Sequence, residues 1–305
     1  MRRRRGTAVA IALSLAALAA AGCGFGPGEG VGEVSLTVTR DYGAEPVLQP
    51  VTGEASESDT VMRVLERDAD ISTRYGGGFV QSIDGLEAEE RFDRSFDWFF
   101  YVNGVESPVG AADYSLHGGE AIWWDYRDWS AAQRVPAVVG SWPQPFLDGY
   151  EGERRPVAVD CLGSGGACNA VRASLAAAGA TVAAGSPQHA IRVLVGPWAR
   201  LREDAAAMQI EDGPQTSGVF AGFERRGAGL RLVGLGVDGK SAQVFGPGAG
   251  LVAATRRYEA PPTWVVTGVG DAGVRAAAGL LDTADLRDHY AVAAEGGKET
   301  PLPVQ

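Results

Sequence analysis

The chain has 305 residues, of which 45% are hydrophobic and 21% charged, so it carries enough apolar side chains for one large or two ordinary folded domains. Its net charge is -11, and it falls to -15 when the N-terminal arginines Arg2 to Arg5 are left out. This acidity argues against a nucleic-acid partner, because phosphates need a basic surface. With three His and three Cys in the chain, we predict no metal site built from imidazoles or thiolates.

The N-terminus has the pattern of an export signal. Arg2 to Arg5 precede an apolar run from Ala8 to Ala21, and small residues lead up to Cys23. We therefore predict a signal peptide at 1–23 and a location outside the cytoplasm. Ala20-Ala21-Gly22-Cys23 resembles the lipoprotein box of bacteria, which implies that Cys23 is acylated and holds the protein to membrane lipid. An ordinary secreted cysteine is the alternative, and the glycine-rich residues 24–33 are expected to form a flexible tether.

When Cys23 is set aside, Cys161 and Cys168 are the two cysteines that remain. Outside the cytoplasm, where we expect this protein, thiols tend to be oxidised. We predict a disulfide between them, which closes a short loop. A metal-binding pair or a reactive thiol is the alternative.

The distribution of charge divides the rest of the chain. Residues 34–128 contain 19 acidic and 7 basic side chains, whereas 154–290 contain 12 acidic and 14 basic ones. We therefore predict a first domain at 34–128 and a second at 156–292, with a flexible tail at 293–305. The proline-containing residues 129–155 are expected to link the two domains. This linker should pack against them, because it carries apolar side chains at Val135, Val138, Val139, Trp142 and Phe146.

In the first domain, Asp59 is expected to cap a helix over 59–66, where apolar residues recur at helical spacing. Period-two alternation with β-branched and aromatic residues predicts strands at 34–39, 79–83, 98–102 and 121–126. This order predicts an α+β fold with a mixed sheet around one helix.

The second domain has the alternating pattern of an α/β fold. The predicted strands are 156–161, 191–195 and 263–268, and the predicted helices are 169–178, 199–208, 248–256 and 271–281, the last with Asp271 as its N-cap. Short antiparallel strands are expected at 218–223, 230–235 and 242–245.

Four segments of the first domain carry a family resemblance. They are Tyr75-Gly76-Gly77-Gly78-Phe79 through Ile83-Asp84-Gly85, Asp97-Trp98-Phe99-Phe100-Tyr101-Val102-Asn103-Gly104, Tyr114-Ser115-Leu116, and Gly119-Glu120-Ala121-Ile122-Trp123-Trp124-Asp125-Tyr126. Together they resemble the transcobalamin C-terminal-like (DUF4430-type) domain. The resemblance implies a β-grasp-like fold for 34–128, and it makes cobalamin a candidate bound ligand, although the protein needs no cofactor. It does not extend to the second domain.

The aromatic strands of this domain are the predicted binding surface. Alternation places Trp98 and Phe100 on one face of the sheet and Phe99 and Tyr101 on the other. Since one helix covers only one face, an exposed aromatic face is expected, and such faces usually bind something. The predicted ligand-binding residues are Tyr75, Phe79, Trp98, Phe99, Tyr101, Asn103, Tyr114, Trp123 and Trp124. The alternative is that the second face packs against the linker or the other domain.

The sequence gives no support for catalysis, and no catalytic residue is predicted. His117, His189 and His289 are isolated, and neither G-x-S-x-G nor H-E-x-x-H occurs. Glu87, Glu89 and Glu90 are expected to face solvent. The functional prediction is therefore a cell-surface lipoprotein, not an enzyme, that binds a small ligand through its first domain. The alternative is a protein-interaction or envelope-structural module whose partner is an envelope or transporter protein.

Overall fold

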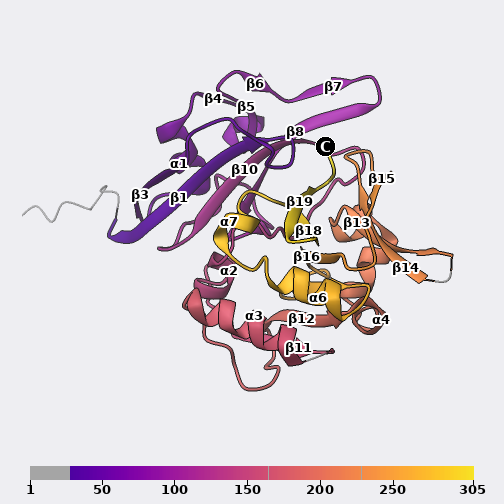
Figure 1. The fold of residues 1–305 in the computed structure, drawn as a ribbon. Helices are drawn as coiled ribbons and strands as arrows, with labels where there is room; N and C mark the ends of the chain where they lie inside the picture. Colours follow the sequence, from indigo (N-terminus) through magenta and orange to yellow (C-terminus); the bar gives the residue numbers. More distant parts are fainter. Residues whose placement is uncertain (1–27, 164, 228) are drawn as a thin grey trace, which may run out of the picture.

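The computed structural model describes residues 28–163, 165–227 and 229–305. The predicted signal peptide, Cys23 and most of the predicted tether therefore lie outside the described residues. Two sheet-based parts make up the fold: a first half, residues 28–128, and a second half, residues 156–305, joined by the connecting segment 129–155 (Figure 1). Both contain strands and helices, as an α+β fold requires. Within the described residues, no helix is both long and apolar enough to cross a membrane.

The first half is built on a seven-stranded sheet. In it, β1 runs parallel to β10, and β10 is antiparallel to β8. On its other side β1 pairs with β2 and β3, whereas β8 pairs at its two ends with β7 and β9. The strands are β1 (Gly30–Arg40), β2 (Glu45–Pro46), β3 (Val51–Ser56), β7 (Glu89–Arg91), β8 (Arg94–Val102), β9 (Val105–Glu106) and β10 (Ala121–Asp128).

Helix α1 (Val61–Asp68) covers one face of this sheet, where Leu36, Ile122 and Trp124 point toward it. Its N-cap is Thr60, whose hydroxyl accepts a hydrogen bond from the amide of Arg63 at 3.3 Å. The prediction that Asp59 caps the helix is wrong, because the Asp59 carboxylate instead accepts hydrogen bonds from the amide and the hydroxyl of Ser56.

A three-stranded sheet extends the first half beyond α1. It consists of β4 (Ile71–Arg74), β5 (Phe79–Ile83) and β6 (Leu86–Glu87), with the 3₁₀ turn η1 (Tyr75–Gly77) between the first two. Strand β5 has the predicted bounds, and β8 and β10 contain the other two aromatic strands that the sequence predicts.

The second half is built on a six-stranded sheet in the order β11-β12-β17-β16-β18-β19. The first three strands are parallel, and the others are antiparallel to their neighbours. The strands are β11 (Val157–Cys161), β12 (Ile191–Pro197), β16 (Gly250–Thr255), β17 (Thr263–Gly268), β18 (Ala291–Glu295) and β19 (Lys298–Leu302).

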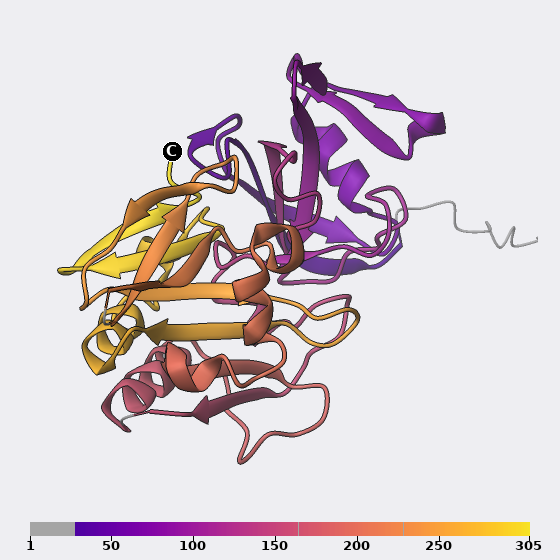
Figure 2. The same ribbon diagram turned by 90° about the vertical axis from the view of Figure 1, so that its right-hand side faces the viewer.

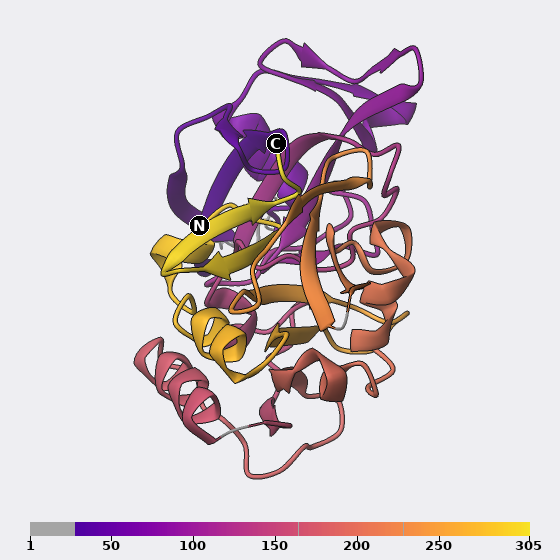
Figure 3. The ribbon, with the colours of Figure 1, turned by 45° about the vertical axis from the view of Figure 1, so that its right-hand side comes forward.

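Helices α3 (Gly165–Ala177) and α6 (Asp271–Ala278) lie side by side on one face of this sheet (Figure 3). The N-cap of α6 is Gly270, and the predicted cap Asp271 lies in the first turn. Against the other face pack the expected antiparallel strands and several short helical turns. These elements are β13 (Ala221–Arg226), β14 (Gly229–Leu235), β15 (Ser241–Val244), α4 (Trp198–Leu201), the 3₁₀ helix η2 (Ala207–Asp212) and α5 (Pro214–Ser217).

Three further predictions for the second half are wrong. The helix expected over 199–208 is interrupted, because α4 ends at Leu201 and the 3₁₀ helix η2 begins at Ala207. Residues 248–256, expected to be helical, contain β16, a fully buried strand between β17 and β18. A short apolar run that is buried on both faces has no period that separates a strand from a helix. The tail expected at 293–305 contains β19, which pairs with β18, so it is part of the sheet. Helix α7 (Thr283–Leu286) precedes this hairpin.

The connecting segment packs as its composition predicts. It contains α2 (Gln144–Leu147). The rings of Trp142 and Phe146 meet edge to face at 5.2 Å between centroids, and both contact Trp264 of β17. Val135, Val138 and Val139 are buried as well. Figure 2 shows the first half lying against the second, with this segment between them.

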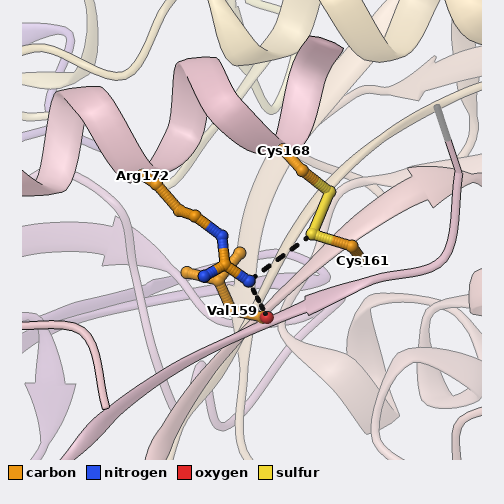
Figure 4. The surroundings of a disulfide bond; sticks show 4 residues. All are labelled: Val159, Cys161, Cys168 and Arg172. Atoms are coloured by element: carbon orange, nitrogen blue, oxygen red, sulfur yellow. Dashed lines mark hydrogen bonds between the residues drawn. A yellow bond between two sulfur atoms is a disulfide. The ribbon is translucent and has the colours of Figure 1, made fainter. Parts of the chain in front are cut away.

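The predicted disulfide between Cys161 and Cys168 is present and joins the end of β11 to the first turns of α3. Arg172 reaches back from α3, and its Nη2 lies 3.0 Å from the carbonyl oxygen of Val159 and 3.7 Å from the sulfur of Cys161 (Figure 4). The disulfide therefore fixes a strand-to-helix turn that the arginine also holds.

Candidate functional site

The face of the first sheet that α1 leaves free is covered by the second half. Tyr101 of β8 and Trp123 of β10 are 0% and 2% exposed, and both rings contact the ring of Tyr290, at the start of β18. Tyr42 contacts Tyr290 and Phe220 at centroid distances of 5.0 Å. The expectation of an open aromatic face is therefore wrong for these rings, and the alternative, packing against the other half, holds.

A buried carboxylate lies at the centre of this contact. Asp125 of β10 accepts hydrogen bonds from the hydroxyl of Thr39 at 2.6 Å and the hydroxyl of Tyr290 at 3.0 Å. It also accepts from the amides of Tyr42 and Gly43, each at 3.0 Å. Burial raises the pKa of Asp125 to about 6, although these donors act in the opposite direction. The Asp125 carboxylate thus links β1, through Thr39, and the turn at Tyr42 and Gly43 to Tyr290 of the second half.

Arg127 is buried beside this network. Its guanidinium lies 3.7 Å from the centroid of the Phe99 ring and donates to the carbonyl oxygens of Ala132 and Gln133. A stacked guanidinium that bonds two carbonyl groups fixes the start of the connecting segment against β8. Phe99 is therefore half-buried under Arg127.

Two further predicted residues have structural roles. Asn103 is fully buried at the β8–β9 hairpin turn, where its side chain donates to Gly149 O at 3.0 Å and accepts from Ala121 N at 2.8 Å. Tyr114 is buried and donates to the Glu120 carboxylate at 2.8 Å. Neither side chain is available to a ligand.

The other five predicted residues, Tyr75, Phe79, Trp98, Phe99 and Trp124, lie around two hollows at the free edge of β8. Strand β7 pairs with β8 as far as Phe96, and β9 pairs with it from Tyr101 onward. Residues 97–100 therefore have a strand partner on one side only, among the paired strands that the structure describes. The hollows open at this gap in the edge of the sheet.

We call the two hollows together the aromatic groove. The smaller measures about 190 Å³ and is lined by Gly78, Phe79, Val80, Trp98, Phe99, Phe100, Glu106, Ser107, Gly110, Ala111 and Trp124. The larger measures about 430 Å³ and is lined by Arg74, Tyr75, Phe79, Gln81, Ala88, Glu89, Glu90, Ser95, Phe96, Asp97 and Trp129. Phe79 belongs to both, and its ring meets that of Tyr75 edge to face at 6.2 Å.

The charges of the aromatic groove are mostly negative. Glu89, Glu90, Asp97 and Glu106 line it, with Arg74 as the one cation among the lining residues, and two of these acids, Glu89 and Glu106, are paired with Arg91 and Arg134 outside the lining. Burial raises the pKa values of both Asp97 and Glu106, and Glu106 also accepts a bond from Arg134 at 2.9 Å. A neutral or cationic molecule with flat apolar groups fits this combination better than an anion.

The groove residues that sequence reasoning missed include three aromatic ones, Phe96, Phe100 and Trp129, and the acid Glu106. Phe100 packs on Trp124 at 4.9 Å between ring centroids, and it was not predicted as a ligand residue although Trp98, on the same face of β8, was. Trp129 follows the predicted domain boundary by one residue. The run Trp98-Phe99-Phe100-Tyr101 could have pointed to Phe100, and the aromatic residues on either side of the boundary could have pointed to Trp129.

The histidines and acids that the structure describes are not gathered into a metal-binding cluster. His117 is exposed, with its Nδ1 3.7 Å from Glu120. Over residues 28–163, 165–227 and 229–305, no group of three or more His, Cys, Asp or Glu side chains is placed to hold a metal ion.

Residues 58–128, from just before α1 to the end of β10, match the family described as "Domain of unknown function (DUF4430)". The family resemblance that the sequence motifs predict is thereby confirmed for this segment, which contains the aromatic strands β5, β8 and β10. The family description names no activity.

No curated protein matches the chain. Among solved structures, the chain is similar to a crystal structure of a Ruminococcus gnavus protein described as a "putative metal binding protein". The two are 16% identical, and the match covers 32% of this chain and 97% of the other, with a TM-score of 0.25. A score of this size carries no argument about fold or function.

Proposed function

We propose that the first half binds a small molecule, without catalysis, in the aromatic groove. The observation that carries the proposal is that five of the predicted aromatic residues line the two hollows at the gap in the edge of β8. Tyr75, Phe79 and Phe99 offer the accessible surface, whereas Trp98 and Trp124 are buried beneath it at 4% and 3% exposure. An engineered apolar cavity of about 150 Å³ holds benzene, so the smaller hollow has room for about one ring. The rest of the ligand would lie over the larger hollow, against Tyr75 and Trp129.

The proposed ligand is neutral or cationic and flat, because the groove combines aromatic walls with four carboxylates and one arginine. Cobalamin remains the compound to test first, since the motifs resemble a transcobalamin domain. Neither hollow is large enough to enclose a whole corrinoid, so such a ligand would insert one edge and leave the remainder exposed.

We further propose a β-grasp-like fold for the first half and a lipid anchor at Cys23. The first proposal is supported by the order of elements: the β1–β3 hairpin, α1, β8 and then β10 parallel to β1. The second is supported by the N-terminal sequence alone. A non-catalytic lipoprotein with a binding groove would present its ligand at the cell envelope.

The test is calorimetric titration of cyanocobalamin, cobinamide and free dimethylbenzimidazole into the purified full-length protein. Saturable binding of any of them should weaken about tenfold or more in Phe79→Ala and Tyr75→Ser, because both remove aromatic contact area. Phe92→Ser is the matched control, since Phe92 and Tyr75 are both exposed aromatic residues with a positive φ and Phe92 lines neither hollow. Loss of affinity that is equal in all three variants would refute the site, and no heat with any compound would remove the corrinoid class.

A protein partner is the second candidate function, and one observation favours it. Phe92, at the tip of the β7–β8 hairpin, is fully exposed and has φ of 52°, a conformation that is costly for a bulky residue. It lines neither hollow, so Phe92→Ser should leave small-molecule binding intact and should weaken only an interaction with a protein.

A further inference from the structure

A second cleft, of about 530 Å³, lies where the connecting segment meets the second half. Its walls come from three distant segments: residues 133–136, residues 205–216 around η2, and residues 256–258 after β16. No sequence motif pointed to it, because its residues are brought together only by the fold.

Arginine and amide groups dominate the chemistry of this cleft. Arg134, Arg256 and Arg257 line it, with Asp212 as the one acid among the lining residues. We call it the cationic cleft. Arg256 is buried and fixed, because it donates to Glu151 at 2.8 Å and to the carbonyl oxygen of Ala260 at 2.8 Å. The Nε of Arg134 donates a hydrogen bond to the Glu106 carboxylate, and this guanidinium is exposed. Its terminal N–H groups can therefore donate to a ligand.

The rim of the cationic cleft presents a cation and a ring together. The guanidinium of Arg257 lies 5.4 Å from the centroid of the Tyr258 ring, and both side chains are exposed. Tyr258 has φ of 51°, so its ring is held outward on a backbone conformation that costs free energy for a bulky residue. Such strained, exposed residues gather at binding sites more often than elsewhere.

The wall of the cleft also contains an unsatisfied donor. The side-chain nitrogen of Gln209 is buried and has no hydrogen-bond acceptor among the residues that the structure describes. A buried donor without an acceptor is unfavourable, so a small rotation of this amide toward an oxygen bound in the cleft would be stabilised.

From these observations we propose that the cationic cleft binds a small anion through carboxylate or phosphate oxygens. The guanidinium of Arg257, which has no carboxylate partner among the described residues, would hold the oxygens together with the terminal N–H groups of Arg134, and Tyr258 would cover the ligand. Arg134 and Arg256 are paired with Glu106 and Glu151, so Arg257 supplies the uncompensated charge. Guanidinium groups bond such oxygens in pairs, which gives both charge and direction. The proposal does not rest on the aromatic groove, whose lining is acidic and would take the opposite charge.

The experiment is titration of the full-length protein with inorganic phosphate and, separately, with citrate, followed by calorimetry at low and high salt. We expect saturable binding of one or both, weakened by added salt because the contacts are ionic. The anion that binds more tightly, phosphate or citrate, tells whether the natural ligand carries a phosphate or a carboxylate group. Saturation by neither up to tens of millimolar would overturn the proposal.

Variants locate the binding. Arg257→Gln should weaken it about tenfold or more, since a charge-assisted hydrogen bond is lost. Arg275→Gln, on an exposed arginine of α6 that does not line the cleft, is the matched control and should bind normally. Arg257 is exposed, so its variant should fold, which thermal melting checks. Equal affinity in both variants would overturn the assignment, whatever the aromatic groove binds.

Discussion

The hydroxyl of Tyr290 donates a hydrogen bond to the carboxylate of Asp125 at 3.0 Å, and these two residues belong to different halves of the chain. Tyr101 adds a second link, because its hydroxyl lies 3.2 Å from that of Tyr290. The face that was expected to be open is therefore closed by a polar network inside an aromatic contact. The halves should unfold as one cooperative unit.

Tyr290→Phe removes the donor and keeps the ring. Because a hydrogen bond to a buried charged group is worth about 1.5–3 kcal/mol, we expect the free energy of unfolding to fall by about that amount. Urea denaturation measures it. Tyr258→Phe, at an exposed position, should change the stability by less than about 0.5 kcal/mol. A loss in Tyr290→Phe no larger than that of the control would mean that the network does not hold the halves together.

Gly43 allows a close approach between the halves. Its φ is +85°, and a Cβ placed there would lie 1.7 Å from the carbonyl oxygen of Asp288. We expect Gly43→Ala to destabilise the protein by about 3 kcal/mol or more, since the clash is with backbone that cannot move aside cheaply.

Two other glycines separate the two causes of that loss of stability, which are the positive φ and the clash with Asp288. Gly76 also has a positive φ but open space around it, so Gly76→Ala should cost only about 1 kcal/mol of backbone strain. Gly53 has neither a positive φ nor a close neighbour, and Gly53→Ala should be nearly neutral. If Gly43→Ala lost no more than Gly76→Ala, the close contact with Asp288 would be disproved.

Asp125 should give the stability a specific pH dependence. Its pKa is raised to about 6 in the folded protein, against about 3.9 in an unfolded chain, so the folded state binds more protons between these values. This group therefore favours folding fully below about pH 4, and that contribution is lost as the pH rises through about 6. The loss amounts to about 2–3 kcal/mol at most.

The measurement is urea denaturation of the natural protein and of Asp125→Asn from pH 4 to pH 7. The difference in stability between the two removes the contributions of acids such as Asp128 and Asp204, whose pKa values are lowered and which act in the opposite direction. As the pH rises, the natural protein should lose stability relative to the variant. If the difference stayed constant, or if the natural protein gained stability relative to the variant as the pH rises, the pKa of Asp125 would not be raised.

The disulfide should contribute to stability through the short loop that it closes. Cys161 and Cys168 are separated by 7 positions in sequence, for which loop closure predicts about 2–3 kcal/mol. Replacing both by Ala should lower the melting temperature, and a reductant should lower that of the natural protein similarly. The double variant should not respond to reductant. If reduction left the natural protein unchanged, the turn would be held by packing and by Arg172 alone.

Short-range patterns predicted most of the strands and the disulfide. Strand β5 begins at Phe79 and strand β17 at Thr263, as alternation and β-branched residues indicated. The errors fall where local signals compete: Thr60 and not Asp59 caps α1, and β16 has the composition of either element. The first choice is local, because Ser56 engages the Asp59 carboxylate, whereas the second depends on β17 and β18, which follow later in the chain.

The candidate sites also combine features that local sequence patterns predict with features that only the folded chain determines. Aromatic residues from Tyr75 to Trp124 were recognised from their motifs, but Phe79 lines the groove while Tyr101 is sealed beneath Tyr290.

Alternation along a strand tells which side chains share a face, because the period of a strand is local. It does not tell which face is covered, because the covering surface is folded from residues more than one hundred positions away. For the same reason Arg134, Gln209 and Arg257 carry no common signal in the sequence, and only their packing into one cleft makes them a candidate site.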